Sequence, residues 1–463
     1  MGTPQRLNVV LIVIDAARRD RFGCYGYGRG TTASIDDLAR ESLVFSRMIA
    51  PAPWTLPSHA SLFTGLYSRE HGADRPGLRM HDGLLTLGEH LAAHGYAPVF
   101  VSNNPLVSRR WGIINGAAPV MMRREFDPDF RRGLGATWSR RVKTILGAAD
   151  RGARATNQLI GRLLPGLPSP FFLFINYMEC HWPYMPLRTY ERRFVRRRHT
   201  VSQAARHRLR MRTRRSWEAE LVQDRDRVDL LSDLYDAALA YVDDRIGELL
   251  TLLQRDGRLD DTLVIVTSDH GEGLGDHGLI GHGMHLYQSL LHVPFLARIP
   301  GWAAVRVDGL AQFTDVFAGL CRVLGLSVPP HLADRPFAAD PFAPTGRGRE
   351  FAFAEWHQWE GERLARRLQT FPGFRSMPSA EAVQDRQYKL IIEPASGAEM
   401  LFDLQADPGE EHNLSGQHPE VRRRLAGALD QWRRLCGPAG RETAYSSEEA
   451  RALEARLADL GYI

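Results

Sequence analysis

The chain has 463 residues, 44% of them hydrophobic and 24% charged, with a formal net charge of +5. This is an ordinary globular composition, long enough for about two or three structural units. The four cysteines lie far apart without a CxxC spacing, which argues against a zinc knuckle or a disulfide framework and predicts free, buried thiols.

The positive charge of the chain is carried almost entirely by arginine, because lysine occurs only at Lys143 and Lys389. Arginine suits planar, bidentate recognition of phosphate, so an anionic substrate is compatible with this composition. Bulk charge alone identifies no partner, and no specific nucleic-acid partner is predicted.

The first apolar run, Leu7 to Ile14, is too short to span a bilayer and is followed at once by charged residues. No small-residue cleavage site follows it, so the sequence predicts no transmembrane anchor and a cytoplasmic location, with secretion by an unrecognised route left open. The run is interpreted as a buried, central parallel strand that ends at Asp15.

Strand, loop and helix then alternate along the chain, which predicts an α/β fold. Each chemical motif comes directly after a predicted strand, where open α/β sheets assemble their ligand sites. In chain order, the expected elements are a helix from Ile35 to Leu43, a helix from Ser58 to Leu66, a helix from Leu84 to His94, a strand from Ala97 to Ser102, a strand from Phe171 to Tyr177, a helix from Leu230 to Leu253 and a strand from Thr262 to Thr267.

Two arginine-rich stretches, about 131–162 and 191–217, interrupt this order and are predicted to be helical insertions. They could form a lid, contact an acidic partner or lie on an anionic membrane surface. The simpler interpretation, which we prefer here, is a plain solvated helical face.

A boundary is predicted near residue 335, where the sequence becomes rich in proline, aspartate and alanine. It divides a catalytic domain, 1–335, from a C-terminal subdomain, 336–463. The expected elements of the subdomain are strands at Phe351 to Glu355 and Tyr388 to Glu393, and helices at Pro419 to Cys436 and Ser447 to Leu460.

Four groups at separate strand ends, Asp15, Thr55, Asp269 and His270, would together suit one divalent metal with the threonine oxygen among its ligands. A hydroxyl is far too weak an acid to ionise alone at neutral pH, and coordination lowers its pKa. The mixed ligand set favours zinc or manganese, with magnesium or calcium possible.

The order of these motifs resembles the sulfatase family of the alkaline phosphatase superfamily. The resemblance implies an α/β, alkaline-phosphatase-like mixed and mostly parallel sheet between helices, with a smaller C-terminal α+β subdomain, and an enzyme that hydrolyses esters. It rests on Asp15 followed by Tyr25-Gly26-Tyr27, the segment from Thr55 to Gly65, the segment from Thr267 to Gly278, Leu401-Phe402-Asp403-Leu404, Asp407-Pro408-Gly409-Glu410, Asn413-Leu414 and the closing Leu460-Gly461-Tyr462-Ile463.

The chain departs from that family at the nucleophile. Thr55 stands where sulfatases carry a cysteine or serine that is oxidised to formylglycine, and threonine cannot become that aldehyde. Threonine must instead attack directly and leave an ester for water to cleave, as the related phosphodiesterases and phosphoethanolamine transferases do. Ala16 replaces a second metal-binding aspartate, and His59 replaces the arginine that supports formylglycine.

The resemblance also suggests which residues contact the substrate. His181 is the first candidate for the general acid, and His282 is assigned to binding a phosphoryl oxygen, with His285 less certain. If His181, His282 and His285 converge, a second metal is possible. Glu272 and Asp276 are expected to order the loop after His270. The candidates for oxyanion binding, each of which could equally be a cap or turn residue, are Arg75, Asn103 and Asn104.

The leading hypothesis is a metal-dependent hydrolase that cleaves a phosphate ester through a covalent phosphothreonine at Thr55, with His181 or His282 protonating the leaving alcohol. The ester could be a phosphodiester, a phosphomonoester or a phosphonate ester. Three alternatives stay open: a soluble phosphoryl or phosphoethanolamine-type transferase, a sulfate ester hydrolase that works without formylglycine, and a degenerate homologue that only binds.

Overall fold

The fold was analysed in a computed structural model. It describes residues 6–74, 79–115, 120–122, 150–196, 222–343, 348–357 and 378–437. Among these residues, no helix is both long and apolar enough to cross a membrane. The four cysteines are free thiols, as expected, and all but Cys24 are buried.

The main sheet is mixed and mostly parallel, and it is built around β1 (Asn8–Ile14), every residue of which is buried. On either side of it lie the parallel strands β5 (Phe171–Tyr177) and β6 (Thr262–Thr267). The strand order is β11-β2-β10-β6-β1-β5-β3-β4, with β9 paired to β2. The other strands are β2 (Leu43–Ile49), β3 (Ala97–Ser102), β4 (Val120–Met122), β9 (His292–Val293), β10 (Phe295–Arg298) and β11 (Val305–Gln312).

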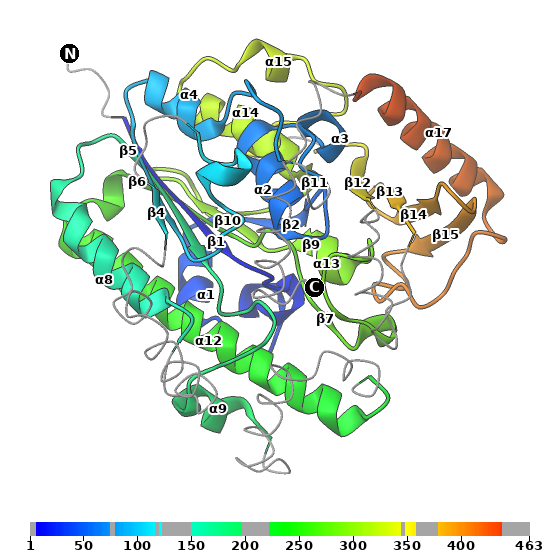
Figure 1. Cartoon of the computed structure of the whole chain (residues 1–463), viewed down its shortest axis with the longest axis horizontal. Helices are drawn as coiled ribbons and strands as arrows, with labels where there is room; N and C mark the ends of the chain where they lie inside the picture. Colours follow the sequence, from blue (N-terminus) through cyan, green and yellow to red (C-terminus); the bar gives the residue numbers. More distant parts are fainter. Residues whose placement is uncertain are drawn as a thin grey trace.

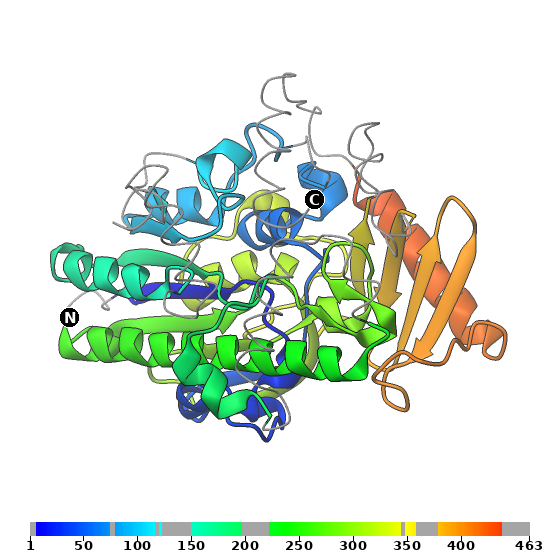
Figure 2. The same cartoon turned by 60° about the horizontal axis from the view of Figure 1, so that its bottom comes forward.

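Helices cover both faces of this sheet, because the side chains of β1 alternate between two hydrophobic cores. Val9, Leu11 and Val13 belong to the first core, and Val10 and Ile12 to the second. Figures 1 and 2 show the resulting layers. The first core includes α2 (Thr55–Thr64), α4 (Leu87–Ala93) and α14 (Phe313–Val323), and the second includes α1 (Ala33–Ala39), α8 (Ala153–Leu163) and α12 (Arg225–Arg255).

Short elements complete the part of the main unit that the structure describes. They are helices α3 (Ser68–His71), α9 (Arg188–Phe194), α13 (Gln288–Leu291) and α15 (Pro330–Ala333), and strands β7 (Gly273–Leu274) and β8 (Ile280–Gly281).

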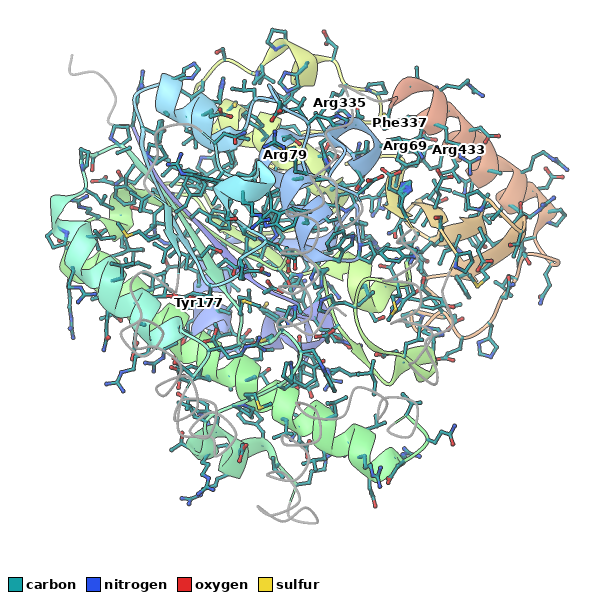
Figure 3. All side chains as sticks on the ribbon, in the orientation of Figure 1. Arg69, Arg79, Tyr177, Arg335, Phe337 and Arg433 are labelled. Atoms are coloured by element: carbon teal, nitrogen blue, oxygen red, sulfur yellow. The ribbon has the colours of Figure 1, made fainter. Side chains whose placement is uncertain are left out.

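The smaller C-terminal sheet is antiparallel, with strand order β12-β13-β14-β15, and α17 (Pro419–Leu435) packs against it. It meets the main unit at α3, where the Arg69 guanidinium bonds both Glu355 and Glu381, and Arg433 of α17 shares Glu381 (Figure 3). The strands are β12 (Ala352–Trp356), β13 (Ala380–Gln384), β14 (Tyr388–Glu393) and β15 (Ala398–Asp403).

The predicted fold class is confirmed, and the strands predicted from Ala97, Phe171, Thr262 and Tyr388 have the expected bounds. The helix predicted to reach Leu43 is wrong in its second half. Helix α1 ends at Ala39, and Leu43 opens β2, because an apolar strand residue happened to continue the helical spacing.

Helix α2 begins at Thr55, three residues before the predicted start at Ser58. Proline is tolerated at Pro57 because the N–H groups of a helix's first turn have no partner within the helix. The boundary near residue 335 stays a prediction. Residues 131–149, 197–217 and 447–460, which hold most of both arginine-rich stretches and the last predicted helix, lie outside the described residues.

Candidate functional site

The candidate site lies at the carboxyl edge of the main sheet, where several predicted residues meet. Asp15 follows β1 directly, Asp269 lies two residues after β6 and Asn104 two residues after β3. The carboxyl ends of these parallel strands share one edge, so distant parts of the chain are brought together there. Thr55, the first residue of α2, reaches the same edge.

The carboxylates of Asp15 and Asp269 and the imidazole of His270 form a compact, fully buried cluster. Each offers one ligand atom, and these atoms all lie within 4.8 Å of one another. Asp15 Oδ1 and Asp269 Oδ2 are buried with no hydrogen-bond partner in the described structure. Since buried carboxylate oxygens are normally paired, these two atoms fit a bound cation.

Hydrogen bonds hold the other polar atoms of the cluster and leave Asp15 Oδ1 and Asp269 Oδ2 unpaired. Asp269 Oδ1 accepts hydrogen bonds from the backbone N–H groups of Ala16 (3.1 Å) and His270 (3.0 Å). His270 Nδ1 is 2.8 Å from the Gly271 carbonyl, so Nδ1 carries the proton and the lone pair of Nε2 faces Asp269 Oδ2 at 3.4 Å. A neutral imidazole in this tautomer is a suitable metal ligand.

The pKa values reflect two acids buried together without a compensating charge. Burial and, after it, the nearby carboxylate of Asp269 raise the pKa of Asp15 to about 7. Burial also raises the pKa of Asp269 to about 7 and lowers that of His270 to about 4. A divalent cation would restore the charged carboxylates and keep the imidazole neutral.

The Thr55 hydroxyl lies against this cluster. Its Oγ1 is 3.3 Å from His270 Nε2 and 3.5 Å from Asn104 Nδ2, and the side chain is fully buried. The N-terminus of α2 carries the positive end of the helix dipole, which favours an anion beside Thr55.

The two asparagines after β3 have separate environments. Asn104 Oδ1 accepts a hydrogen bond from Leu106 N (2.9 Å), so its amide nitrogen faces the site and donates to Asp15 Oδ2 at 2.7 Å. Asn103 instead exchanges hydrogen bonds with Thr156 of α8, at 3.1 and 3.4 Å. The structure therefore brings Asn104 to the cluster and joins Asn103 to a helix.

Sequence reasoning missed Asn176 of β5. Its amide is fully buried beside Asp15, and it lowers the pKa of that carboxyl group. Asn176 pairs in register with Val13 on β1 and Ser102 on β3. A polar residue inside the apolar run from Phe171 to Tyr177 was the available signal.

Two of the three candidate histidines converge. The rings of His181 and His282 are 4.7 Å apart, and the ring of His282 is 4.3 Å from that of His270. His285 instead lies against Tyr287, with ring centroids 5.1 Å apart. Within the described residues, no second group of three metal-binding side chains accompanies the Asp15 cluster.

Burial governs the titration of these histidines and of the acid beside them. It lowers the pKa of His181 well below its usual range, and lowers that of His282 and of His285 to about 3. Glu272, whose Oε1 is 2.7 Å from His282 Nδ1, has a pKa raised to about 8 by its burial.

His59 lies one helical turn behind Thr55. Its Nδ1 is 2.9 Å from the Thr55 carbonyl, its ring meets Phe174 edge to face, and burial lowers its pKa to about 3. Asp269 Oδ2 lies 3.5 Å from the same nitrogen, so His59 borders the cluster from within α2. Arg75 lies outside the described residues.

A mostly parallel sheet whose carboxyl edge gathers carboxylates, imidazoles and a hydroxyl is the arrangement expected of an α/β enzyme, and the family match identifies the class as hydrolases of ester bonds. The chain matches the family model described as sulfatase over residues 7–326, and it belongs to the sulfatase family. Enzymes of this family and of the alkaline phosphatase superfamily use a divalent metal, and the Asp15 cluster has the donors for one.

Two curated relatives align with most of the chain. The uncharacterized sulfatase YidJ of Escherichia coli (strain K12) is 25% identical over 451 residues, covering 92% of this chain and 86% of YidJ. The multifunctional alkaline phosphatase superfamily protein PehA of Trinickia caryophylli is 25% identical over 481 residues, covering 89% of this chain and 91% of PehA.

Among solved structures, the phosphonate monoester hydrolase of Agrobacterium radiobacter superposes with a TM-score of 0.74 at 23% identity, covering 93% of this chain and 96% of that one. The phosphonate monoester hydrolase of Silicibacter pomeroyi gives a TM-score of 0.71 at 20% identity, covering 94% and 96%. These likenesses establish the fold over nearly the whole chain.

Proposed function

We propose that this protein hydrolyses an anionic phosphate ester, either a phosphodiester or a monoester of phosphate or phosphonate, through a covalent phosphothreonine at Thr55. The observation that carries the proposal is the position of the Thr55 hydroxyl, which lies at the N-terminus of α2, 3.3 Å from His270 Nε2 and beside two buried carboxylates. Since threonine cannot be converted to formylglycine, the hydroxyl itself is left to attack.

Asp15, Asp269 and His270 would hold the divalent cation, and their mixed oxygen and nitrogen donors suit zinc or manganese best, with magnesium or calcium possible. When bound, the cation would lower the pKa of the hydroxyl and neutralise charge on the ester.

The other residues of the site have complementary tasks in this proposal. The α2 N-terminus and the amide of Asn104 stabilise charge on the phosphoryl oxygens. Thr55 attacks as its ionised oxygen: Oγ1 forms a bond to phosphorus as the bond to the leaving oxygen breaks, and His181 or His282 gives that oxygen a proton. Water then attacks phosphorus, one of its protons returns to the histidine, the other stays with the phosphate product, and Thr55 Oγ1 is released in its ionised form.

Hydrolysis of a sulfate ester is the second candidate, because the family match and the sulfatase relative YidJ support it equally well. A sulfate monoester is also a tetrahedral anion, so the same charged groups could bind it. The two candidates differ in the atom that Thr55 attacks and therefore in the covalent intermediate.

The test compares 4-nitrophenyl phosphate, bis(4-nitrophenyl) phosphate, a phenylphosphonate monoester and 4-nitrophenyl sulfate as substrates of the metal-loaded protein. Replacing Thr55 by alanine should lower turnover by at least about 10³-fold, because it removes the nucleophile. Thr64→Ala is the matched control, since Thr64 lies at the far end of α2 and its hydroxyl donates to the Ala60 carbonyl.

Mass spectrometry of acid-quenched reactions should find the phosphoryl group on the peptide that contains Thr55. A sulfated peptide would establish the second candidate instead. Full activity of the Thr55→Ala variant would rule out covalent catalysis at this residue.

A further inference from the structure

The turn that follows Asp15 has a strained backbone. Ala16 has a φ of 60°, in the left-handed region that residues with a Cβ rarely adopt. Glycine enters this region freely, and asparagine and aspartate enter it more readily than other residues, but alanine has neither advantage. The conformation of Ala16 therefore persists only because the surrounding structure holds it there.

Side chains from two other parts of the chain hold this turn. The Tyr235 hydroxyl of α12 donates to the Ala16 carbonyl at 2.8 Å and accepts a hydrogen bond from the backbone N–H of Arg18 at 2.7 Å. The Oγ of Ser268, which follows β6, accepts a hydrogen bond from Ala17 N at 2.7 Å. Tyr235 thus binds the turn at both ends, and Ser268 binds it between them.

The same turn contacts both carboxylates of the cluster. Asp15 precedes Ala16 directly, and the Ala16 N–H donates to Asp269 Oδ1 at 3.1 Å. The peptide group between Asp15 and Ala16 therefore joins the two acids whose unpaired oxygens fit a cation. We infer that Tyr235 is a positioning residue, which holds the left-handed turn and so fixes both carboxylates in the arrangement that binds the cation. This inference rests on the cation site of the proposed function.

Tyr235 is itself held firmly enough for this role. Its side chain is fully buried in the second core, and its ring packs edge to face against Tyr184, with centroids 5.2 Å apart. Without the hydroxyl, Ala16 would relax toward negative φ. That relaxation would rotate the peptide groups on either side of Ala16, including the one whose N–H binds Asp269.

The first experiment measures manganese binding to the full-length chain by isothermal titration calorimetry, after a chelator has removed any bound metal. Tyr235→Phe keeps the ring and removes the hydroxyl. It should raise the Kd for Mn²⁺ by about 10- to 100-fold, the usual effect of losing a group that orients metal ligands.

The matched control is Tyr241→Phe. Tyr241 is also buried on α12, but its hydroxyl donates to Asp150 Oδ2, at 2.6 Å, and not to the turn. Because this replacement leaves the turn intact, it should change the Kd for Mn²⁺ by less than about threefold. A wild-type Kd in Tyr235→Phe would overturn the inference.

Ala16→Gly separates the proposed role from a merely structural one. Glycine adopts positive φ without strain, so the turn no longer needs the Tyr235 hydroxyl to hold it. In a chain that already carries Ala16→Gly, Tyr235→Phe should raise the Kd for Mn²⁺ by less than about threefold, although the lost hydrogen bonds still lower stability. An equal rise in Kd with and without Ala16→Gly would overturn the inference, because Tyr235 would not then act through the strain at Ala16.

A second measurement tests the inference even if Tyr235→Phe fails to fold. Ala16 and Ala17 are both fully buried, but only Ala16 of the two has a positive φ. In urea unfolding of the metal-free protein, Ala16→Gly should raise the midpoint because it relieves strain, and Ala17→Gly should lower it. A lower midpoint for both variants would show that Ala16 is not strained, and the inference would fail.

These outcomes are separable from those that test the proposed function. If Thr55→Ala keeps full activity while Tyr235→Phe weakens manganese binding as expected, the covalent mechanism fails and the role of Tyr235 stands. If ester cleavage depends on Thr55 but Tyr235→Phe binds manganese like the wild type, the inference fails and the proposed function stands. A wild type that binds neither manganese nor zinc also overturns the inference, because the turn then has no cation site to arrange.

Discussion

Two buried polar clusters of this protein differ in how completely their atoms are paired. In the C-terminal sheet, Lys389 Nζ donates to Glu410 Oε1 at 2.8 Å, and Glu410 Oε2 accepts a hydrogen bond from Gln288 N at 2.5 Å. At the edge of the main sheet, Asp15 Oδ1 and Asp269 Oδ2 are equally buried but have no partner in the described structure. The difference separates a fully paired cluster within the fold from one whose two unpaired oxygens fit the cation proposed above.

The C-terminal cluster nevertheless reaches the candidate site through backbone contacts. Gln288 begins α13, and the carbonyl of Leu290 in that helix accepts a hydrogen bond from Gly271 N at 2.8 Å, directly after His270. A Cβ on Gly271 would lie 1.9 Å from the Ser289 carbonyl oxygen, so only glycine fits there. The C-terminal cluster therefore supports the loop that carries His270 of the other cluster.

The largest effect is expected from Asp269→Asn, which removes a charge from the incompletely paired cluster. Activity should fall by at least about 10³-fold, because the cation loses an anionic ligand. The wild type should gain about 2.7 kcal/mol of stability at a metal concentration 100 times its Kd, and the variant should gain far less. Metal analysis and thermal unfolding with and without metal measure both effects.

Asp243→Asn is the control for that comparison, since Asp243 is buried and both of its oxygens accept backbone hydrogen bonds, from Ser34 and Ile35, at 2.9 Å. It should lose stability and keep its metal. Wild-type metal affinity in Asp269→Asn would mean that the unpaired oxygens do not mark a cation site.

A smaller effect, confined to stability, is expected from breaking the fully paired cluster. Lys389→Met leaves the Glu410 carboxylate buried without its cation, which should cost about 3–5 kcal/mol in the free energy of unfolding. The double variant Lys389→Met/Glu410→Gln should recover part of this loss, since it leaves no unpaired charge and keeps an acceptor for Gln288 N. Urea unfolding of the two variants and the wild type measures these differences. Equal stability of all three would show that the ion pair contributes nothing to the free energy of unfolding.

The sequence predicted which residues would meet in the cluster better than it predicted their surroundings. Asp15, Asp269 and Asn104 each follow an apolar strand, and parallel strands bring such residues to one edge. The separate environments of Asn103 and Asn104 could not be predicted, because they depend on which way each side chain turns relative to α8. Neither could the contact of His181 with His282, which needs two loops about 100 residues apart to meet.

The secondary structure likewise divides into strands that the sequence predicts and strands that it does not. Long buried strands such as β1 and β5 are unambiguous apolar runs, but β2, β10 and β11 were not predicted. The strand β10 has only four residues, and β11 is exposed along half its length, so neither gives a clear periodic signal. The side of the sheet beyond β6, where β10 runs antiparallel to both β6 and β2, therefore becomes visible only when the strands pair.

The smallest expected effect is a change in stability on replacing His71. This histidine is buried and hydrogen-bonded, and it lies outside the cluster at the strand ends. Its Nδ1 accepts a hydrogen bond from Ala73 N and its Nε2 lies 3.1 Å from Ser61 Oγ. Burial, and then the nearby His81, lowers its pKa from the usual 6.5 to about 3. Between these values the unfolded chain binds the proton and the folded protein does not, so stability is lost as the pH falls from about 6.5 toward 3, by at most about 1.4 kcal/mol per pH unit.

His71→Gln keeps a donor and an acceptor of similar reach but does not titrate. At pH 7.5 it should be less stable than the wild type by about 1 kcal/mol, through poorer hydrogen bonds, and this deficit should shrink and then reverse as the pH is lowered toward 5. Urea unfolding of both proteins at a series of pH values measures the difference. A deficit that stays constant with pH would mean that protonating His71 in the folded protein costs no stability. In that case, hydrogen bonding of a buried histidine would not by itself require its neutral form.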